Sequence, residues 1–353
     1  MEPKISLIIC TRDRASNLKA TLEAIGRMTV PADLSAELIV VDNGSTDGTK
    51  ETANGSTLTN MPVRYLHEPR KGKGNAYNMA LAAARGEALL FTDDDVRPHA
   101  GWIEQMVQPI ISGTADGVLG KVVLPEHLAR SWMEPIHKTM LAETSGRDGQ
   151  EVEFLTGANM AFSRRVTEKV PQFDAELGPG ALGFCEETLY SLQLKAAGYK
   201  LKFVEGAVIE HHFDVSRLSR EAFASRAKGE GRSKAYLDYH WNHQPLNHPH
   251  LSRLRSQIKY ELQKIGLAHK WAHSEGMPTW EINQLVWISY FDQYLAESNR
   301  PRNYEKRGLR KLGSRGASTS MQGIDPAVTN GVAIGALETL STASAARGTA
   351  GTK

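Results

Sequence analysis

The strongest constraint on the fold is an alternation of apolar and helix-forming segments over about the first hundred residues. Helical patterns at about 18–28 and 76–85 lie among four apolar runs typical of strands buried on both faces. These runs are residues 5–10, 38–41, 63–66 and 88–92. Such alternation predicts an α/β fold with a doubly wound, mostly parallel sheet. Ligands of such sheets bind beyond the carboxyl ends of the strands.

The rest of the chain divides into regions of different character. Between about residues 118 and 203, short apolar runs alternate with loops, and one clear helix is predicted at 187–197. Residues 219–299 have a mainly helical pattern, whereas Gly, Ser, Thr and Ala with little periodicity follow Arg310. We therefore predict three parts, namely an α/β domain (1–215), a helical C-terminal region (216–305) and a flexible tail (306–353).

Composition excludes several classes of protein. Of the 353 residues, 41% are hydrophobic and 23% charged, a balance that supports a packed core rather than global disorder. A net charge of +2 is too small for a dedicated nucleic-acid binder. Cys10 and Cys185 lie in no metal-binding spacing, so two free thiols in a reducing compartment are expected. We find neither a signal peptide nor a membrane span, which favours a cytoplasmic protein. Attachment to a membrane surface and homo-oligomer formation are left open.

The sharpest local signal is Thr92-Asp93-Asp94-Asp95, which follows the fourth apolar run directly. On an extended chain, Asp93 and Asp95 project to the same side. Two carboxylates that converge at a strand end suit Mg²⁺ or Mn²⁺, with a diphosphate completing the coordination shell. The alternative is a solvated acidic turn or helix cap. The position after a buried strand favours the metal site, because clustered like charges there are costly without a cation.

Two further segments are compatible with nucleotide binding. Asp42 ends a predicted strand, where its side chain is free to accept hydrogen bonds from a base or a ribose. The alternative is turn chemistry, with Ser45 or Asp47 capping the next helix. Lys73 lies in the basic, glycine-containing segment 70–75 before a predicted helix, which is either an anion cradle or a charged surface loop.

Two residue pairs are candidates for catalysis and metal binding. Glu186 and Glu187 lie at the start of a predicted helix. The helix dipole alone explains at least one glutamate there, and the other is a candidate general base. His211 and His212 follow the apolar run 204–209. Such a pair is a candidate ligand for a metal or a phosphate, although an ordinary surface or interface pair is more common.

Taken in order, these segments resemble family 2 glycosyltransferases, enzymes with the GT-A fold. The resemblance covers roughly residues 4–215, and the joint order and spacing of the segments are specific. The matching segments are ISLIICTRDRASNL, LIVVDNGSTDGT, KGKGNAYNMALAAARGE, ALLFTDDD, FLTGANMAFSR, CEETLYSLQLKAAGY and VIEHH.

The resemblance implies a role for most of the candidate residues. Thr11, Arg14 and Asp42 would contact the nucleoside, and Asp93 would contact the ribose or the metal. Apart from the resemblance, Lys73 and Asp94 are further candidates for binding the nucleotide sugar. The residues expected to bind the metal are Asp95 and Asp93, together with His211 or His212. Glu187 occupies the position of the catalytic base, where the family more often has Asp after Glu, and Glu186 is the alternative.

The resemblance also implies a reaction, an inverting transfer of a sugar to an acceptor hydroxyl. The base deprotonates the hydroxyl, its oxygen attacks C1 of the sugar, and Mn²⁺ or Mg²⁺ stabilises the diphosphate leaving group. A UDP-sugar is the favoured donor, with dTDP- and GDP-sugars as alternatives. The acceptor is a saccharide, a lipid-linked molecule or a small molecule.

Two other functions are alternatives to glycosyl transfer. A sugar nucleotidyltransferase also places carboxylates on a metal, but it usually carries a glycine-rich basic loop where this chain has Thr11-Arg12-Asp13-Arg14. A non-catalytic nucleotide-sugar-binding protein is disfavoured by the presence of Asp93, Asp95 and Glu187.

Overall fold

Strands and helices alternate through the first half of the computed structural model, which describes residues 3–144, 152–267, 269 and 271–313. The strands are β1 (Ile5–Thr11), β2 (Ala36–Asp42), β3 (Val63–His67), β4 (Ala88–Thr92), β5 (Val96–Pro98), β6 (Gly117–Val123), β7 (Asn159–Ser163) and β8 (Leu201–His211). The helices beside them are α1 (Ala15–Gly26), α2 (Thr49–Gly55), α3 (Lys73–Ala83), α4 (Trp102–Ile111), α5 (Pro135–Met140) and α6 (Glu186–Ala196). The four strands predicted at the start of the chain are confirmed as β1 to β4.

All of these strands form one sheet in the order β3-β2-β1-β4-β7-β6-β8-β5. The first four are parallel to one another, and β6 is parallel to β8. Strand β7 runs antiparallel to β4 and β6, and the short β5 runs antiparallel to β8. The predicted mostly parallel sheet is confirmed. Because β1, β2 and β4 are adjacent and parallel, their carboxyl ends meet at one edge, where Thr11 pairs with Asp42.

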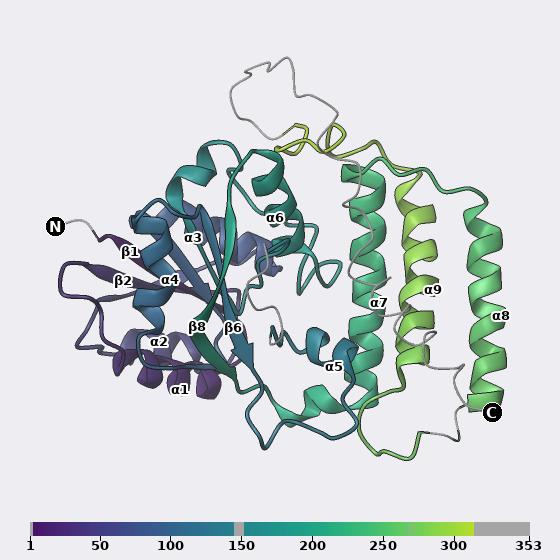
Figure 1. Cartoon of the computed structure of the whole chain (residues 1–353), viewed down its shortest axis with the longest axis horizontal. Helices are drawn as coiled ribbons and strands as arrows, with labels where there is room; N and C mark the ends of the chain where they lie inside the picture. The colour runs from purple at the N-terminus through teal and green to yellow at the C-terminus, as the bar shows by residue number, and fades with distance from the viewer. Residues whose placement is uncertain (1–2, 145–151, 268, 270, 314–353) are drawn as a thin grey trace, which may run out of the picture.

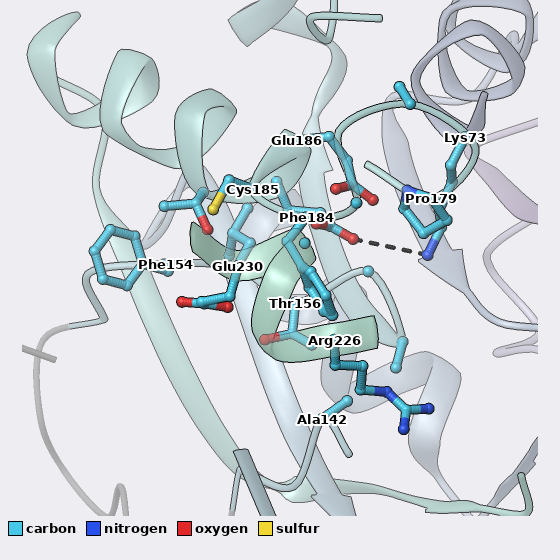
Figure 2. Close-up of a pocket in the computed structure, with 18 of the residues that line it drawn as sticks. Lys73, Ala142, Phe154, Thr156, Pro179, Phe184, Cys185, Glu186, Arg226 and Glu230 are labelled. Atoms are coloured by element: carbon cyan, nitrogen blue, oxygen red, sulfur yellow. Dashed lines mark ion pairs between the residues drawn. The ribbon is translucent and has the colours of Figure 1, made fainter. Parts of the chain in front are cut away.

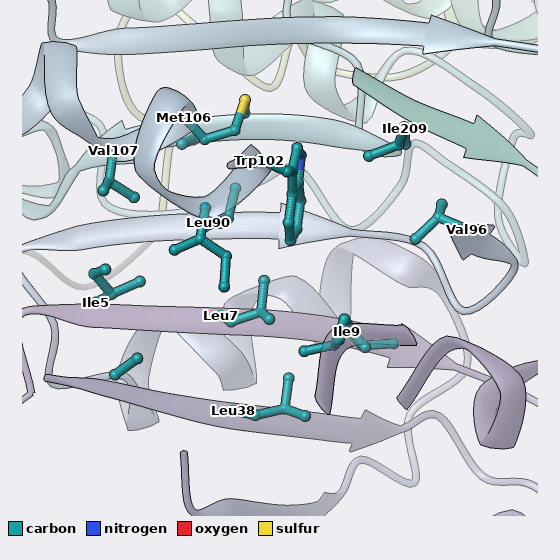
Figure 3. Packing of buried hydrophobic residues seen from close by; sticks show 14 of the residues in the cluster. Ile5, Leu7, Ile9, Leu38, Leu90, Val96, Trp102, Met106, Val107 and Ile209 are labelled. Carbon is teal, nitrogen blue, oxygen red and sulfur yellow. The ribbon is translucent and has the colours of Figure 1, made fainter. Parts of the chain in front are cut away.

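The sheet is covered on both faces, as its doubly apolar strands predict. Side chains of alternate residues in β1 point to opposite faces. Ile5, Leu7 and Ile9 pack with residues of α1 and α4 such as Trp102, as Figure 3 shows for part of this cluster. Ile8 lies on the other face, in a cluster that includes residues of α3 and α6. This two-sided packing fixes the strand ends, and therefore the side chains that follow them.

The predicted helical region is confirmed and forms a layer beside the sheet domain (Figure 1). It contains α7 (Arg220–Tyr236), which continues into the π-helical turn η3 (Leu237–Trp241), then α8 (Pro249–Leu267) and α9 (Thr279–Glu297). Helix α9 packs between α7 and α8, so α8 is the helix farthest from the sheet. Within the described residues, no helix is both long and apolar enough to cross a membrane.

The segment after α9 corrects the predicted boundary of the tail. Residues 306–313, which the sequence assigns to a flexible tail, lie against the sheet domain. Lys311 Nζ is 2.8 Å from Asp174 Oδ1 and 2.5 Å from Glu176 Oε1. The Asp174 side chain is buried and also accepts hydrogen bonds from Tyr236 and Tyr304. The sequence pattern misses this segment because its contacts are polar and nonperiodic. The remainder of the predicted tail, 314–353, lies outside the described residues.

We predict that the position of a C-terminal truncation decides its effect. Truncation after Arg310 should lower the free energy of unfolding by roughly 1–3 kcal/mol, because the buried Asp174 carboxylate loses a charged partner. Truncation after Gly313 keeps Lys311 and should leave stability unchanged. Chemical denaturation of the two shortened chains and of the full-length Lys311→Met variant measures the difference. Equal stabilities of the two truncated chains would contradict this role of Lys311.

Candidate active site

A cavity of about 1300 Å³ lies where the carboxyl ends of β1 and β4 face α6 and α7. Its walls combine the sheet domain with the helical region. Figure 2 shows Lys73, Glu186, Arg226 and Glu230 around this space, together with aromatic Phe154 and Phe184. A cavity at the carboxyl edge of the parallel strands agrees with the general rule for ligands of such sheets.

Three consecutive carboxylates after β4 occupy the sheet side of the cavity, and each pairs with a basic side chain. Asp93 Oδ1 lies 2.8 Å from Lys73 Nζ. Asp94 accepts a 2.6 Å hydrogen bond from Thr11 Oγ1 and pairs with Arg14 at 2.9 Å. Asp95 pairs with the same Arg14 nitrogen at 2.7 Å. The structure thus brings together Thr11, Arg14, Lys73 and the aspartates, which the sequence interpretation placed in one site.

Different charged neighbours separate the pKa values of Asp94 and Asp95, although both carboxylates are buried. Burial and the neighbouring Asp95 charge raise the pKa of Asp94 to about 6. Burial also acts on Asp95, but His211, Arg217 and Arg14 outweigh it and hold the pKa of Asp95 well below its usual range. Asp95 is therefore the carboxylate that stays ionised, as a metal ligand must.

Asp93, Asp95 and His211 offer ligand atoms that all lie within 4.8 Å of one another. His211 Nδ1 lies 2.8 Å from the carbonyl oxygen of Leu141, which can only accept a hydrogen bond. In the neutral form of His211, which metal binding requires, the proton therefore sits on Nδ1 and the Nε2 lone pair lies 3.2 Å from Asp95 Oδ1 and 3.4 Å from Arg217 Nη1. Asp95 Oδ1 is buried and has no hydrogen-bond partner among the described residues. Nε2 and Oδ1 are therefore two ligand atoms that suit a divalent metal.

His212 occupies a different environment from His211. His211 ends β8, and the side chains of adjacent residues leave an extended chain on opposite sides. His212 Nε2 lies 2.8 Å from Glu210 Oε2, and its ring lies near His127 rather than in the carboxylate cluster. The structure therefore separates the two histidines that the sequence left equivalent, and only His211 belongs to the metal-ligand cluster found among the described residues.

The two candidate bases lie in the first turn of α6 and both line the cavity. Glu187 Oε1 is 3.7 Å from Lys73 Nζ, the ammonium that also pairs with Asp93. Glu186 is buried, and its Oε2 has no hydrogen-bond partner among the described residues. Burial and the nearby Glu187 raise the pKa of Glu186 well above its usual range. A shared lysine therefore links Glu187 to the metal-site aspartate, whereas the surroundings of Glu186 favour its protonated form.

Two glycines make room for these glutamates. A Cβ atom on Gly157 would lie 2.3 Å from Glu187 Oε1, and one on Gly178 would lie 2.7 Å from Glu186 Cδ. Gly178 also has a φ of +86°, which disfavours other residues. Cys185, directly before α6, adopts a φ of +72° that a side chain makes unfavourable. The first turn of α6 is thus packed closely around both carboxylates.

The sequence interpretation missed two arginines of the cavity. Arg217, in the turn η2 (Val215–Leu218), approaches Asp95 at 3.3 Å. Arg226 of α7 donates a 2.9 Å hydrogen bond to the Arg217 carbonyl oxygen. Burial, together with the positive charges of Arg217 and Arg14, lowers the pKa of Arg226 to about 9. Guanidinium groups gathered in this way form an anion site. Nothing in the local sequence distinguishes them from surface arginines of a helical region.

The structure corrects the expectation that Asp42 has a free side chain. Asp42 is buried, and its Oδ1 accepts a 2.8 Å hydrogen bond from the Ser45 backbone N–H. Its Oδ2 accepts another at 2.8 Å from the Tyr65 hydroxyl. Both carboxylate oxygens of Asp42 therefore already have hydrogen-bond partners within the protein. Its neighbour Asn43, not Asp42, lines the cavity. Cys10 and Cys185 are both free thiols, as expected.

Comparison with known proteins agrees with this architecture. Residues 6–171, slightly less than half of the chain, match the sequence model of glycosyl transferase family 2. Glycosyltransferase AglE of Haloferax volcanii is 35% identical over 120 residues, which cover 33% of this chain and 38% of that protein. Glucosyl-3-phosphoglycerate synthase of Mycolicibacterium paratuberculosis is 33% identical over 118 residues, covering 32% of this chain and 35% of that enzyme. The matched part is thus little more than a third of each relative.

A solved structure extends the similarity beyond the matched sequence. The mannosyltransferase PcManGT of Pyrobaculum calidifontis, in complex with GDP-Man and Mn²⁺, superposes with a TM-score of 0.56 at 19% identity. The superposition covers 84% of this chain and 88% of that enzyme. This likeness shows that the fold is of the GT-A type, as the sequence predicts.

We predict that the two histidines differ in their effect on metal binding. His211→Ala should weaken Mn²⁺ binding by at least about tenfold, since even outer-shell partners of a metal contribute about 10–100-fold. His212→Ala is the matched control and should bind Mn²⁺ like the unmodified chain. Calorimetric titration of the nucleotide-free proteins with Mn²⁺ measures both affinities. A loss confined to His212→Ala would reverse the assignment.

Proposed function

We propose that this protein is a metal-dependent glycosyltransferase that moves a sugar from a nucleotide-diphosphate sugar to an acceptor hydroxyl with inversion. One observation carries the proposal. Asp93, Asp95 and His211 form a cluster in the same cavity as Glu187. Lys73 lies between them, because its ammonium pairs with both Asp93 and Glu187. A cation site for a diphosphate and a carboxylate for a hydroxyl proton are the two groups that a single-displacement sugar transfer requires.

The leaving group is assigned to the sheet side of the cavity. Asp93, Asp95 and His211 would hold the Mn²⁺ or Mg²⁺, which supplies positive charge to the departing diphosphate. Arg217 and Arg226 extend the same positive region toward α7. Because Arg14 and Arg217 already pair with the carboxylates, they are placed to turn to phosphate oxygens once a metal neutralises Asp95.

Glu187 is the proposed general base. Its Oε1 lies in the cavity, 3.7 Å from Lys73 Nζ, where a carboxylate can accept the proton of an acceptor hydroxyl. The deprotonated acceptor oxygen then attacks C1 of the sugar, and the bond from C1 to the diphosphate oxygen breaks. Glu186 suits a different role, because a buried protonated carboxyl donates a hydrogen bond rather than accepting a proton. We assign it to orienting the acceptor.

The donor is proposed to be a UDP-sugar, on the basis of family resemblance. The mannosyltransferase with the similar fold is in complex with GDP-Man, so a test of the donor must include guanosine nucleotides. The acceptor is proposed to bind between α6 and α7, where Phe184 and Trp241 offer apolar surface and Glu230 offers a carboxylate. Aromatic faces beside carboxylates are suited to the mixed apolar and hydroxyl surface of a saccharide.

We predict that donor turnover is strictly metal-dependent. Incubation with UDP-, dTDP- and GDP-sugars should release the nucleoside diphosphate from one of them, and Mn²⁺ or Mg²⁺ should restore the release that EDTA abolishes. Asp95→Ala should abolish it as well, and Asp94→Ala should cost less. Chromatography of the products separates the alternatives. Release of pyrophosphate would indicate nucleotidyl transfer instead, and full activity in a metal-stripped sample would contradict the proposed metal.

The adjacent glutamates provide a matched test of the base. Glu187→Gln should lower turnover by about 10²–10⁴, the usual contribution of a general base. It should leave the affinity for nucleotide and metal nearly unchanged. Glu186→Gln keeps a hydrogen-bond donor and should reduce turnover less, with its main effect on the KM of the acceptor. Steady-state kinetics gives both parameters. An inactive Glu186→Gln beside an active Glu187→Gln would exchange the two roles.

A further inference from the structure

Helix α8 exposes a row of large aliphatic side chains, although it belongs to a packed helical layer. None of its residues is buried. The exposed fractions in the row are 44% for Leu251, 53% for Leu254, 51% for Ile258, 65% for Leu262 and 83% for Ile265. These are five of the nine most exposed large hydrophobic side chains among the described residues. Their concentration on one helix sets α8 apart from the rest of the surface.

Helical geometry places these side chains on one face. Their spacings of three and four residues keep them within a single stripe along α8, which we call the α8 stripe. At a rise of about 1.5 Å per residue, the stripe is roughly 21 Å long. The opposite face meets α9, where Arg253 pairs with Asp292 and Tyr260 donates a hydrogen bond to Glu281. The α8 stripe therefore points away from the helical layer, at the outer edge of the molecule in Figure 1.

Basic side chains accompany the α8 stripe. Arg255 and Lys259 are exposed and follow it along one flank, and Lys264 is exposed near the end of the helix. Together with Arg253, the helix has four basic residues and one acidic residue, Glu261. The whole chain carries a formal charge of only +2, so this part of the surface is more positive than the average. An apolar stripe flanked by positive charge is complementary to a surface in which a layer of negative charge covers an apolar interior.

We propose that α8 binds the surface of an anionic membrane, with the α8 stripe inserted at the boundary between headgroups and acyl chains. Amphipathic helices of this composition lie in the plane of the membrane interface. The stripe is a convex ridge of Leu and Ile without aromatic residues, whereas protein interfaces are enriched in Tyr, Trp and Arg at their centres. Arg255 and Lys259 would contact lipid phosphates. This site is separate from the proposed sugar transfer.

The test is flotation of the full-length chain with lipid vesicles. Vesicles of phosphatidylcholine mixed with phosphatidylglycerol should carry the protein, and vesicles of phosphatidylcholine alone should carry much less. High salt should weaken binding to the anionic vesicles, because the Debye length shortens. Arg255→Gln with Lys259→Gln should lower the affinity by roughly fivefold for each residue, the value expected for a basic side chain near an anionic surface.

The apolar part has its own variant and matched controls. Leu254→Ser with Ile258→Ser and Leu262→Ser should reduce vesicle binding by at least about a hundredfold, since three aliphatic side chains no longer leave water. Ile111→Ser with Val215→Ser removes exposed aliphatic side chains elsewhere and should bind normally. Lys19→Gln with Lys50→Gln is the corresponding charge control, on α1 and α2. Circular dichroism checks folding.

Several outcomes would overturn the proposal. These are absence of vesicle binding, equal binding of neutral and anionic vesicles, and unchanged binding of the α8 variants. Sedimentation of the same samples tests for a dimer that the serine variant dissociates. Such a dimer would make the α8 stripe a contact between two copies of this chain. Donor turnover is measured in parallel, so that loss of membrane binding with intact turnover separates this proposal from the proposed function.

Discussion

The accumulation of negative charge directly after β4 is the constraint on which the site depends. Asp93, Asp94 and Asp95 are consecutive, and the last two are buried. Burial of neighbouring carboxylates is unfavourable unless cations compensate them, and a single segment of chain cannot supply those cations in the right places. The protein draws them from separate elements, with Arg14 before α1, Lys73 at the start of α3, and Arg217 in η2. The parallel sheet makes this convergence possible, because it brings the carboxyl ends of β1 and β4 side by side.

The same charges connect the two halves of the proposed chemistry. Lys73 lies between Asp93 of the metal cluster and Glu187 of α6. A change in the charge of one carboxylate therefore alters how strongly Lys73 pairs with the other. Among the described residues, no cation forms an ion pair with Glu186, and burial and the nearby Glu187 favour its protonated form. The two adjacent glutamates therefore have different charged neighbours. A metal ion at Asp95 would in turn free Arg14 and Arg217 for phosphate oxygens, which links donor binding to the charge balance of the site.

The helical region is part of the cavity rather than an independent appendage. Helix α7 supplies Arg226 and Glu230 to its wall, and the buried Asp174 connects α7 with the segment after α9 through Tyr236 and Tyr304. This network lies a few residues before Gly178, whose missing side chain leaves space for Glu186. On the far side of the helical layer, α8 presents aliphatic and basic side chains outward. In the helical region, α7 therefore completes the candidate active site, whereas α8 faces outward and is available to the proposed membrane surface.

The architecture and most of the residues of the site follow from the amino-acid sequence. Buried strands are recognisable from their uninterrupted apolar runs, which predict β1 to β4 together with the acidic segment after β4. Details that depend on contacts between distant residues follow only from the folded structure. The Leu141 carbonyl oxygen selects the His211 tautomer, and the Tyr65 hydroxyl donates a hydrogen bond to Asp42. Lys311 pairs with Asp174 and so attaches to the sheet domain a segment that the sequence pattern assigns to the tail. Arg217 and Arg226 carry no sequence signal at all, because an arginine in a helical region acquires a function only from what folding places opposite it. Local patterns report periodicity and burial, whereas the pairing of charges across the fold depends on distances that no local pattern contains.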